Sequence, residues 1–468
     1  MNKGLKRVLS SEAESYIGKE ILLQGWVRIR RDHGKLIFLD LRDKDGLIQV
    51  VVNPRVSEEA YRVAQEVRPE YVLEITGKVN KRPEGAVNKE IISGTVEVEA
   101  TEVKIISKAE TPPIDLTTSG QETGEDLRLR YRYLDLRRDR MQKNIRERHK
   151  IIKAIRDYLD KEGFIEVETP ILTKSTPEGA RDYIVPSRLE KGRFYALPQA
   201  PQQYKQLLMV AGFEKYFQIA RCFRDEDTRS DRQPEFTQLD LEMSFVERED
   251  VMDLNEKLLI HLVKTLLPNK KIQEVPFPRL THKDVMVKYQ TDRPDLRTDK
   301  NDPDLLAFCW ITDFPFFEKT EGGGWTFTHN PFSSPKPEFM ADLMEKKNIA
   351  QIITNQYDII LNGFEIGGGS IRNHEAKALK KVFEIMGYGE KEIMANFGHM
   401  LRAFSYGTPP HGGIAWGLDR LITVLQNESS IREVIAFAKT GEGRDLMMDS
   451  PSEISEKQLR ELGIKIGK

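Results

Sequence analysis

Cysteine is scarce in this sequence, whose 468 residues include only Cys222 and Cys309. Two cysteines this far apart argue against a disulfide framework and against a cysteine-ligated zinc site, which both need several cysteines at suitable spacing. A reducing compartment is the simplest expectation, so we expect a cytoplasmic protein.

Long apolar runs are also missing. The first twenty residues, MNKGLKRVLSSEAESYIGKE, contain no apolar stretch of signal-peptide length. No later stretch approaches the roughly 20 apolar residues that span a bilayer. We therefore expect no contact with a membrane.

An excess of one charge is absent too. Lysine and arginine number 72, aspartate and glutamate 74, and the net charge is −2. With 39% hydrophobic and 31% charged residues, the composition fits a globular protein rather than a disordered one. Any contact with RNA must therefore come from local basic patches. A chain of this length is expected to form two or more domains.

The most informative stretch is 217–245, FQIARCFRDEDTRSDRQPEFTQLDLEMSF. Alternating apolar and polar residues at both ends predict two half-buried strands joined by a charged loop. On the second strand, one face is apolar and consists of Leu239, Leu241, Met243 and Phe245. The other face could bond a polar ligand and consists of Gln238, Asp240, Glu242 and Ser244. The loop collects Arg224, Glu226, Arg229, Arg232 and Glu235. Arginine forks suit phosphate and carboxylate oxygens, although an exposed charged turn is the plain alternative.

Residues 21–106 contain five candidate strands, with a helix-like segment at 57–67 between the third and the fourth. This order predicts a five-stranded Greek-key barrel of the OB type, whose open face commonly binds oligonucleotides. The expected face carries Arg28, Arg30, Arg31, Phe38, Arg42 and Gln49. Arginine suits phosphate, Phe38 a stacked base and Gln49 a base edge. Taken alone, the segment leaves it equally open that Phe38 is a core residue and that the arginines are merely solvated.

The middle of the chain changes in character. Residues 109–126 are rich in Pro, Thr, Ser and Gly, which predicts a linker. The arginine-rich stretch that follows, 127–141, could contact an RNA backbone or form ion-paired packing between domains. Helical spacing of apolar residues predicts a helix over 142–162, which Gly163 ends. We expect domains at 1–107 and 141–468, with 108–140 as the hinge.

Three later segments carry further candidates. Residues 174–183 form a polar loop that could act as a lid. Residues 357–372, YDIILNGFEIGGGSIR, alternate as a strand that ends in a glycine run, and Asp358 and Glu365 bracket it as ligands for a cation on phosphates would. Residues 407–425 predict a glycine-rich strand feeding a helix that begins near Leu418. Arg420 in its first turn opposes the helix dipole, and an anionic ligand would explain it.

These motifs resemble those of class II aminoacyl-tRNA synthetases. The pattern Phe-Arg-x-Glu at 223–226 with Arg-x-x-x-Phe-x-x-x-Asp at 232–240 is similar to motif 2, and HGGIAWGLDRL is similar to motif 3. Helix, glycine, strand and proline over 142–170 resemble the more degenerate motif 1. LPQAPQQYKQ, FRDEDTRSDRQPEFTQ, NGFEIGGGSIR and YGTPPHGGIAWGLDR resemble the aspartyl-tRNA synthetases of bacterial type, and the likeness covers nearly the whole chain.

The resemblance implies an α+β protein, in which an N-terminal OB barrel binds the anticodon and an antiparallel class II sheet flanked by helices performs the chemistry. It implies a homodimer that joins L-aspartate to ATP and transfers it to tRNA(Asp). The implied aspartate-binding residues are Glu178, Gln202, Lys205, Arg224, His329 and Arg372. The implied ATP-binding residues are Arg224, Asp225, Glu226, Arg232, Gln233, Phe236, Glu365, Gly417, Leu418, Asp419 and Arg420. Arg224 and Arg420 would be catalytic, Asp358 and Glu365 would hold Mg²⁺, and Arg31, Phe38 and Gln49 would meet the anticodon.

The sequence departs from this family in several places. The large domain that bacterial members usually insert between motifs 2 and 3 is absent, because residues 289–297 are followed almost at once by 308–318. Asn330 stands where paired histidines are common, and the tail from Gly441 onward differs from the usual pattern. His33 and Gly85 lie in the two loops linked with charging of both tRNA(Asp) and tRNA(Asn), so we favour a non-discriminating enzyme.

Two other functions stay open. An asparagine-forming synthetase shares the catalytic architecture but would not need residues 1–107. A non-catalytic RNA-binding paralogue should have lost Arg224, Glu365 or Arg420, and all three are present. From the sequence, Arg372→Leu is expected to abolish aspartate activation and to leave the fold intact.

Overall fold

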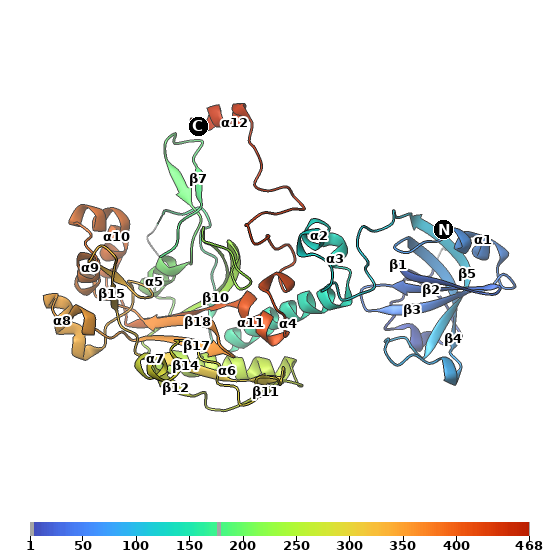
Figure 1. Cartoon of the computed structure of the whole chain (residues 1–468), viewed down its shortest axis with the longest axis horizontal. Coiled ribbons are helices and arrows are strands. Elements are labelled where there is room, and N and C mark those ends of the chain that lie inside the picture. The colour runs from blue at the N-terminus through green and yellow to red at the C-terminus, as the bar shows by residue number, and fades with distance from the viewer. Residues whose placement is uncertain (1–3, 176–178, 468) are drawn as a thin grey trace. The chain divides into compact units, whose positions relative to one another are not determined.

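The computed structural model describes residues 4–175 and 179–467. The chain forms two compact units, Met1–Thr123 and Gly124–Lys468 (Figure 1). The segment expected as a hinge, 108–140, is divided between them. Its last part is helical and belongs to the second unit, since it contains α2 (Glu125–Arg130), α3 (Arg132–Asp135) and the start of α4 (Asp139–Lys161).

The first unit is a closed five-stranded barrel with the strand order β1-β2-β3-β5-β4. Its elements are η1 (Ala13–Tyr16), β1 (Glu20–His33), β2 (Leu36–Arg42), β3 (Leu47–Val52), α1 (Glu58–Glu66), β4 (Val72–Lys81), η2 (Glu84–Ala86) and β5 (Val96–Ser107). Every second residue of a strand points into the barrel, as Ile37, Leu39 and Leu41 do on β2. The predicted OB topology, including the helix after the third strand, is confirmed.

The second unit is built on an eight-stranded sheet with the order β12-β14-β17-β18-β19-β10-β9-β6. The strands are β6 (Ile165–Glu166), β9 (Lys215–Phe223), β10 (Glu235–Ser244), β12 (Arg279–Thr281), β14 (Phe308–Thr312), β17 (Gln356–Leu361), β18 (Phe364–Ile371) and β19 (His411–Gly417). The six central strands pair antiparallel, and the edge strands β6 and β12 pair parallel with their neighbours. This is the antiparallel sheet that the motifs predict.

Helices surround this sheet, and small two-stranded ribbons connect them (Figure 1). The remaining helices are α5 (Gln202–Val210), α6 (Arg248–Leu266), α7 (His282–Tyr289), η3 (Pro337–Phe339), α8 (Met340–Glu345), η4 (Ile349–Gln351), α9 (Ala376–Ile385), α10 (Glu390–Phe404), α11 (Leu418–Leu425), η5 (Ile431–Glu433) and α12 (Glu456–Leu462). The ribbons pair β7 (Ile184–Pro186) with β8 (Phe194–Ala196), β11 (Lys271–Ile272) with β13 (Leu305–Leu306), and β15 (Phe317–Lys319) with β16 (Trp325–Phe327).

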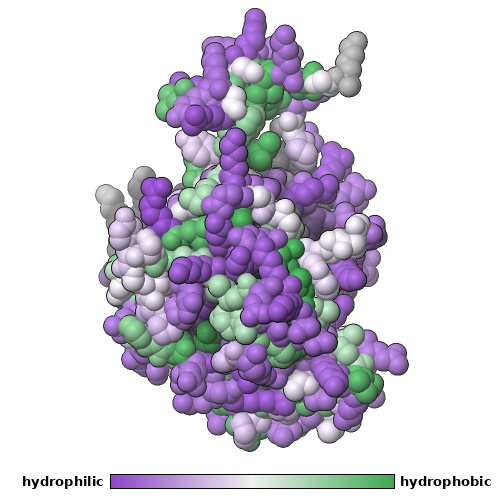
Figure 2. Space-filling view, turned by 90° about the vertical axis from the view of Figure 1, so that its left-hand side faces the viewer, coloured by the Kyte–Doolittle hydropathy of each residue, from purple (hydrophilic) through white to green (hydrophobic). Residues whose placement is uncertain are grey.

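Hydrophilic residues cover most of the face shown in Figure 2. Hydrophobic residues appear among them, also at the top of the view, where Figure 1 places β7 and α12. Within the ranges that the structure describes, no helix combines the length and the apolar character needed to cross a membrane.

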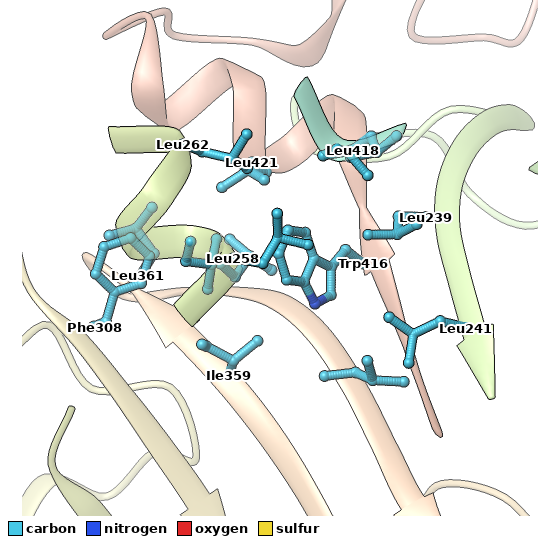
Figure 3. Close-up of a cluster of buried hydrophobic side chains, with 14 of the residues drawn as sticks. Leu239, Leu241, Leu258, Leu262, Phe308, Ile359, Leu361, Trp416, Leu418 and Leu421 are labelled. Atoms are coloured by element: carbon cyan, nitrogen blue, oxygen red, sulfur yellow. The ribbon is translucent and has the colours of Figure 1, made fainter. Parts of the chain in front are cut away.

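The main core lies on one face of the sheet. Leu239 and Leu241 of β10 and Trp416 of β19 point toward Leu258 of α6 and Leu421 of α11 (Figure 3). Strand alternation turns the neighbouring residues of β10 to the opposite face. That opposite face carries Gln238, Asp240 and Glu242, which are also buried. The sheet therefore has an apolar core on one face and buried polar side chains on the other.

The structure corrects three details of the predicted strands. Residues 357–372 form a hairpin, β17–β18, rather than one strand, because the chain turns at Asn362 and Gly363 with φ of 51° and 85°. Asn-Gly is the standard signal for such a turn, since both positions need positive φ. The strand expected over 164–170 has only two residues, Ile165–Glu166. Phe245 does not share the apolar face of β10, because it lies past the strand end, with φ of 59° and 68% exposure.

The arginine-rich stretch after the linker is largely buried. Arg128, Arg132 and Arg138 each donate to Asp135, and Arg128 also donates to Glu433. The carboxylate of Asp135 is fully buried and its pKa is lowered: burial alone would raise it, but the three arginines outweigh that effect. Of the two alternatives for this stretch, ion-paired packing is therefore correct for these three arginines, and contact with an RNA backbone is not. The ion pairs lie within the second unit and not between domains.

Candidate active site

A cavity of about 350 Å³ opens above the polar face of the central strands. Arg224 at the end of β9, Arg372 after β18 and Arg420 in the first turn of α11 all line it. Three segments separated by about 150 and 50 residues of sequence thus bring their guanidinium groups to one hollow. The remaining polar lining is Gln202, Lys205, Glu226, Asp231, Arg232, Gln233, Gln238, Asp240, His329, Asn330, Gln356, Asp358, Glu365 and Asp419.

A cluster of four buried charges lies at the floor of this cavity: Lys205, Asp240 and Arg372 line it, and Glu242 pairs with Lys205 and Arg372 without lining it. Lys205 Nζ lies 2.8 Å from Asp240 Oδ2 and 3.3 Å from Glu242 Oε2. Arg372 donates from Nε to Glu242 Oε1 at 2.8 Å and from Nη2 to Glu242 Oε2 at 3.1 Å, a forked pair. Each of these side chains is at most 2% exposed. The two cations expected from the sequence are therefore already paired with two carboxylates, and the cluster as a whole is close to neutral.

The two carboxylates of the cluster differ in their surroundings. Burial raises the pKa of Asp240, although Lys205 acts in the opposite direction. Burial also acts to raise the pKa of Glu242, but Arg372 and Lys205 outweigh it and the pKa is lowered. Among the described residues, Asp240 Oδ1 has no hydrogen-bond partner. A fully buried acceptor left open beside a cavity is costly unless a ligand donates to it, and an ammonium group would do so.

A second pair of carboxylates lies at the β17–β18 hairpin. A Cβ built on Gly368 would come within 2.7 Å of Asp358 Oδ1 and 3.7 Å of Glu365 Oε1, so both carboxylates lie beside this glycine. The pKa of Asp358 is raised well above its ordinary value, first by burial and then by Glu365. The pair could hold a divalent cation, which would remove this repulsion.

The described residues contain no group of three or more His, Cys, Asp or Glu side chains that could hold a metal. Two carboxylates with an open side suit Mg²⁺, which is usually held by one or two carboxylates together with water and substrate phosphates. His329 lies next to the pair, with Nδ1 3.7 Å from Asp358 Oδ2 and its ring edge-on to Phe314. Burial lowers the pKa of His329, which keeps the imidazole neutral at pH 7.

The glycine run of β18 has a packing role as well as an open surface. A Cβ on Gly369 would lie 2.1 Å from the carbonyl oxygen of Gly413, and a Cβ on Gly413 would lie 2.1 Å from Glu242 Oε2. Any side chain at these positions would push β18 away from β19 or displace Glu242. The glycines therefore bring β10, β19 and β18 close enough for Arg372 to reach Glu242.

The two predicted catalytic arginines lie at the other end of the cavity. The guanidinium group of Arg224 stacks over the ring of Phe236 at 5.0 Å, a cation–π contact. Arg420 donates from Nη2 to Asp231 Oδ2 at 3.2 Å and from Nη1 to the carbonyl of Glu365. Both residues line the cavity, where their guanidinium groups suit an anionic ligand.

Of the predicted ATP-binding residues, Leu418 and Asp225 do not line the cavity, and Asp419 and Gln233 line it with polar groups that are already bonded within the protein. Leu418 is part of the core, and Asp419 accepts hydrogen bonds from Arg148 and from the backbone of Thr237. The amide of Gln233 is engaged by the backbone of Lys439, accepting at 2.8 Å and donating at 3.2 Å. Asp225 lies outside this cavity, bridged to Arg181, and Glu178 lies outside the described residues.

On the barrel, Phe38 lies outside the apolar core, so the alternative that it is a core residue is wrong. Its ring packs edge-on against His33 at 5.6 Å. Arg31 donates to Asp40 at 2.8 Å, and Gln49 donates to Glu97 at 2.8 Å. Phe38 and Gln49 share the outward face of β2 and β3, as their register shows, while Gly85 is exposed in the short helix η2.

Asp240 and Glu242 are absent from the implied aspartate-binding residues, although Asp240 ends the motif 2 pattern. The signal was present, because both lie on the polar face of a strand whose other face is apolar. Their full burial could not be read from that pattern, since a polar strand face is ordinarily exposed to solvent.

Comparison with known proteins identifies the family. Residues 124–441 match the family model described as tRNA synthetases class II (D, K and N). The chain belongs to the class II tRNA synthetases. Residues 21–106 of this synthetase match a model described as an OB-fold nucleic acid binding domain. The Aspartate--tRNA ligase of Macrococcus caseolyticus is 41% identical, with 97% of each chain covered, and that of Staphylococcus aureus is 40% identical, with 97% and 98% covered.

The alignment of this synthetase with the Macrococcus protein runs over 579 positions, which exceeds the 468 residues of this chain by 111. The expected loss of a large insert agrees with this difference. Solved structures share the fold at lower identity. The asparaginyl-tRNA synthetase of Pyrococcus horikoshii superposes with a TM-score of 0.75 at 23% identity, covering 93% of this chain and 98% of its own. A putative aspartyl-tRNA synthetase of Leishmania major gives 0.74 at 18%, covering 94% of each.

Proposed function

We propose that this synthetase is an aspartate–tRNA ligase, which forms aspartyl-adenylate from L-aspartate and ATP and transfers the aspartyl group to tRNA. The observation that carries the proposal is the buried cluster of Lys205, Arg372, Asp240 and Glu242 at the floor of a cavity that Arg224 and Arg420 also line. Curated relatives at about 40% identity over nearly the full length bear the name of this activity.

The cluster suits aspartate. The side-chain carboxylate of the substrate aspartate would bind between Lys205 and Arg372. The ammonium group of the substrate would donate to Asp240 Oδ1, which has no partner among the described residues. Gln202 and His329 would complete the pocket. Asparagine would turn an amide NH₂ toward the donors of Lys205 and Arg372, so that donor faces donor, and sites built on such contacts reject analogues that cannot make them.

Activation joins two anions, so the site must neutralise charge and align the reacting groups. An oxygen of the aspartate α-carboxylate attacks the α-phosphorus of ATP, the bond to the bridging oxygen breaks, and pyrophosphate leaves. Arg224 would hold the α-phosphate and the attacking carboxylate together, and Arg420 would contact the triphosphate. Phe236 would stack on adenine, with Glu226 and Arg232 at its edge and Gly417 closing the site.

Asp358 and Glu365 are the residues that would hold Mg²⁺. When bound there, the ion would neutralise charge on the phosphates and on the departing pyrophosphate. The protein's part is to keep two carboxylates beside Gly368, which has no side chain to fill the space next to them.

In the second step, a hydroxyl of the 3′-terminal ribose of tRNA attacks the aspartyl carbonyl, and AMP leaves. We propose that the barrel selects this RNA through Phe38, Gln49 and Arg31. Residues 1–107 act as the anticodon-binding domain and 141–468 as the catalytic domain, and the helical end of 108–140 belongs to the catalytic unit. Phe38 presents an aromatic face outward, on which a base could stack. Arg31 and Gln49 offer hydrogen-bond donors, which in the structure bind the carboxylates of Asp40 and Glu97.

Further parts of the proposal concern partners and location. His33 and Gly85 occupy the two positions that the family resemblance links with charging of tRNA(Asn) in addition to tRNA(Asp), and His33 contacts the proposed base platform Phe38. A homodimer is supported by exposed apolar residues around the motif 1 strand, where Ile165, Ile171 and Leu172 are 52%, 41% and 53% exposed. Neither cysteine forms a disulfide, in keeping with the cytoplasm.

Pyrophosphate exchange with ATP and each amino acid tests the activity. We expect exchange with aspartate and with no other amino acid. If none of the amino acids supports exchange, that result would favour a non-catalytic paralogue. Charging of tRNA(Asp) and tRNA(Asn) transcripts side by side then tests the barrel. Failure to charge either RNA, with intact exchange, would favour an asparagine-forming synthetase that keeps only the first step, and charging of tRNA(Asp) alone would show a discriminating enzyme.

Phe38→Ala is expected to lower kcat/KM for tRNA by about 10- to 100-fold, because stacking of one base on an aromatic ring contributes about 1–3 kcal/mol. Aspartate-dependent exchange should stay within twofold, since Phe38 is in the first unit and the cavity is in the second. Tyr16→Ala, another partly exposed aromatic of the same unit, is the control and should change neither rate. Equal loss of charging and exchange in Phe38→Ala would contradict the division of labour.

A further inference from the structure

A buried chain of hydrogen bonds runs from His411 to the wall of the candidate active site. His411 is the first residue of β19, and its Nε2 lies 3.1 Å from Nε2 of Gln206 on α5. Gln206 Oε1 in turn accepts from Gln202 Nε2 at 3.2 Å, one turn away on the same helix. His411 and Gln206 are fully buried and do not line the cavity, whereas Gln202 does. The chain therefore connects a group behind the pocket with the pocket itself.

The direction of these hydrogen bonds is set at His411. Its Nδ1 lies 2.8 Å from the carbonyl oxygen of Pro409, which can only accept, so Nδ1 carries the proton. Burial lowers the pKa of His411, although the nearby Glu242 and the bond to Pro409 act in the opposite direction. The other charged neighbours, Arg372 and His374, lower this pKa further. The imidazole is therefore neutral at pH 7, and its Nε2 is an acceptor.

A neutral imidazole that accepts at Nε2 orients both glutamine amides. Gln206 must turn its NH₂ group toward that acceptor, which leaves its Oε1 facing Gln202. Gln202 must then use its own NH₂ group on Gln206, so its Oε1 is the atom left for the cavity that it lines. None of the residues that the structure describes donates to this oxygen. Gln202 therefore offers the ligand an acceptor, and the tautomer of His411 determines that it does so.

The ligand group that meets Gln202 Oε1 must be a donor. Both carboxylates of aspartate and the triphosphate of ATP only accept, and the ammonium group is the donor of the amino acid. A second open acceptor, Asp240 Oδ1, lies on β10, against which α5 packs. The other oxygen of Asp240 accepts from Lys205, which follows Gln202 by one turn of α5. The two open oxygens line one cavity, where they suit a single ammonium group.

We propose that His411 is a positioning residue, which acts through Gln206 to hold the amide of Gln202 with its oxygen toward the ammonium group of aspartate. This inference rests on the proposed function, because it concerns the binding of that substrate. With the chain reversed, Gln202 would turn its NH₂ group toward the ammonium group, and donor would face donor. His411 does not line the cavity, so its side chain affects the affinity for aspartate without touching either substrate.

His411→Phe tests this role in the full-length protein, because phenylalanine keeps a flat ring but cannot accept from Gln206. In pyrophosphate exchange we expect KM for aspartate to rise about 10-fold, as the loss of one hydrogen bond to a charged group produces, while kcat and KM for ATP stay within twofold. Gln206→Leu, which interrupts the chain at its middle, should have the same effect. The double variant should be no worse than either single variant, since His411 acts only through Gln206. His399→Phe is the matched control: His399 Nε2 lies 2.6 Å from Oε1 of Gln203, the neighbouring glutamine of α5, and neither residue lines the cavity, so both KM values should match those of the wild type.

Succinate, which is aspartate without its amino group, separates positioning from damage to the pocket. As a competitor of aspartate in exchange, succinate still needs Lys205 and Arg372 but has no ammonium group for Gln202. Its inhibition constant should therefore stay within twofold of wild type in His411→Phe and Gln206→Leu. The role of His411 would be overturned by an unchanged KM for aspartate, by additive losses in the double variant, or by equal weakening of succinate and aspartate. Exchange by the wild type would still support the activity in each of these cases, whereas its absence would overturn the proposed function as well.

Discussion

Replacing Arg372 with leucine is expected to abolish aspartate-dependent exchange and to destabilise the second unit at the same time. Arg372 is the partner of Glu242 in a fork of 2.8 and 3.1 Å, and both side chains are buried. Removing one member of a buried ion pair leaves an uncompensated charge, which costs about 3–5 kcal/mol. The loss of a buried charge contact to the substrate should lower kcat/KM for aspartate by about 10²- to 10³-fold.

Two further variants separate the effect on activity from the effect on stability. Arg372→Leu/Glu242→Leu removes both charges, so it should recover much of the urea midpoint lost in Arg372→Leu but none of the exchange activity. Arg372→Lys keeps the charge but loses the fork, and should retain the fold with partial activity. Near-normal exchange in Arg372→Leu would show that the aspartate pocket is misassigned, and an unchanged urea midpoint would show that Glu242 does not depend on Arg372.

The sequence alone predicts that Arg372→Leu leaves the fold intact, and the buried pair with Glu242 is the physical reason for the different expectation stated here. The sequence shows which residues carry charge but not which charges meet across strands. Glu242 lies opposite Gly413 in the register of β10 and β19, and the missing side chain at Gly413 gives Glu242 the room to reach Arg372. The pattern predicted a positively charged pocket, whereas the folded floor is nearly neutral before the substrate binds.

Elements with strong periodicity could be predicted well. The strands β9 and β10 alternate regularly, and the step from β19 into α11 at Leu418 combines glycines with a helical apolar pattern. These segments can be recognised in the sequence because their apolar residues repeat with the period of a strand or of a helix. The cavity follows from these elements, since Arg224 and Arg420 occupy their ends.

Other positions depend on contacts that no local pattern contains. Gln233 belongs to motif 2, yet its amide binds the backbone of Lys439, 206 residues away in sequence. The turn at Asn362 and Gly363 is different, because its signal was present and the alternation on either side concealed it. With that turn, Asp358 and Glu365 come together beside Gly368 instead of bracketing one long strand.

Replacing Asp358 with asparagine is expected to stabilise the protein without ligands while lowering its activity. Asp358 is buried and faces Glu365, and these two effects raise its pKa and make its charged form unfavourable. Asparagine keeps an oxygen that can accept from Gln356 Nε2, now 3.2 Å from Asp358 Oδ1, and it removes the repulsion. We therefore expect a Tm higher by on the order of 2 °C, the shift that about 1 kcal/mol produces in a large domain.

The same substitution should lower exchange by about 100-fold at a fixed Mg²⁺ concentration, because a carboxylate ligand that neutralises the cation is lost. Raising the Mg²⁺ concentration should recover part of this loss, as expected when the affinity for the ion is what has changed. Asp313→Asn is the matched control, since that carboxylate is paired with Arg248 and Lys336 and does not line the cavity. It should lower the Tm slightly and leave the Mg²⁺ dependence unaltered. A lower Tm for Asp358→Asn, or exchange that ignores Mg²⁺, would mean that the buried carboxylate supports the fold rather than the ion that accompanies ATP.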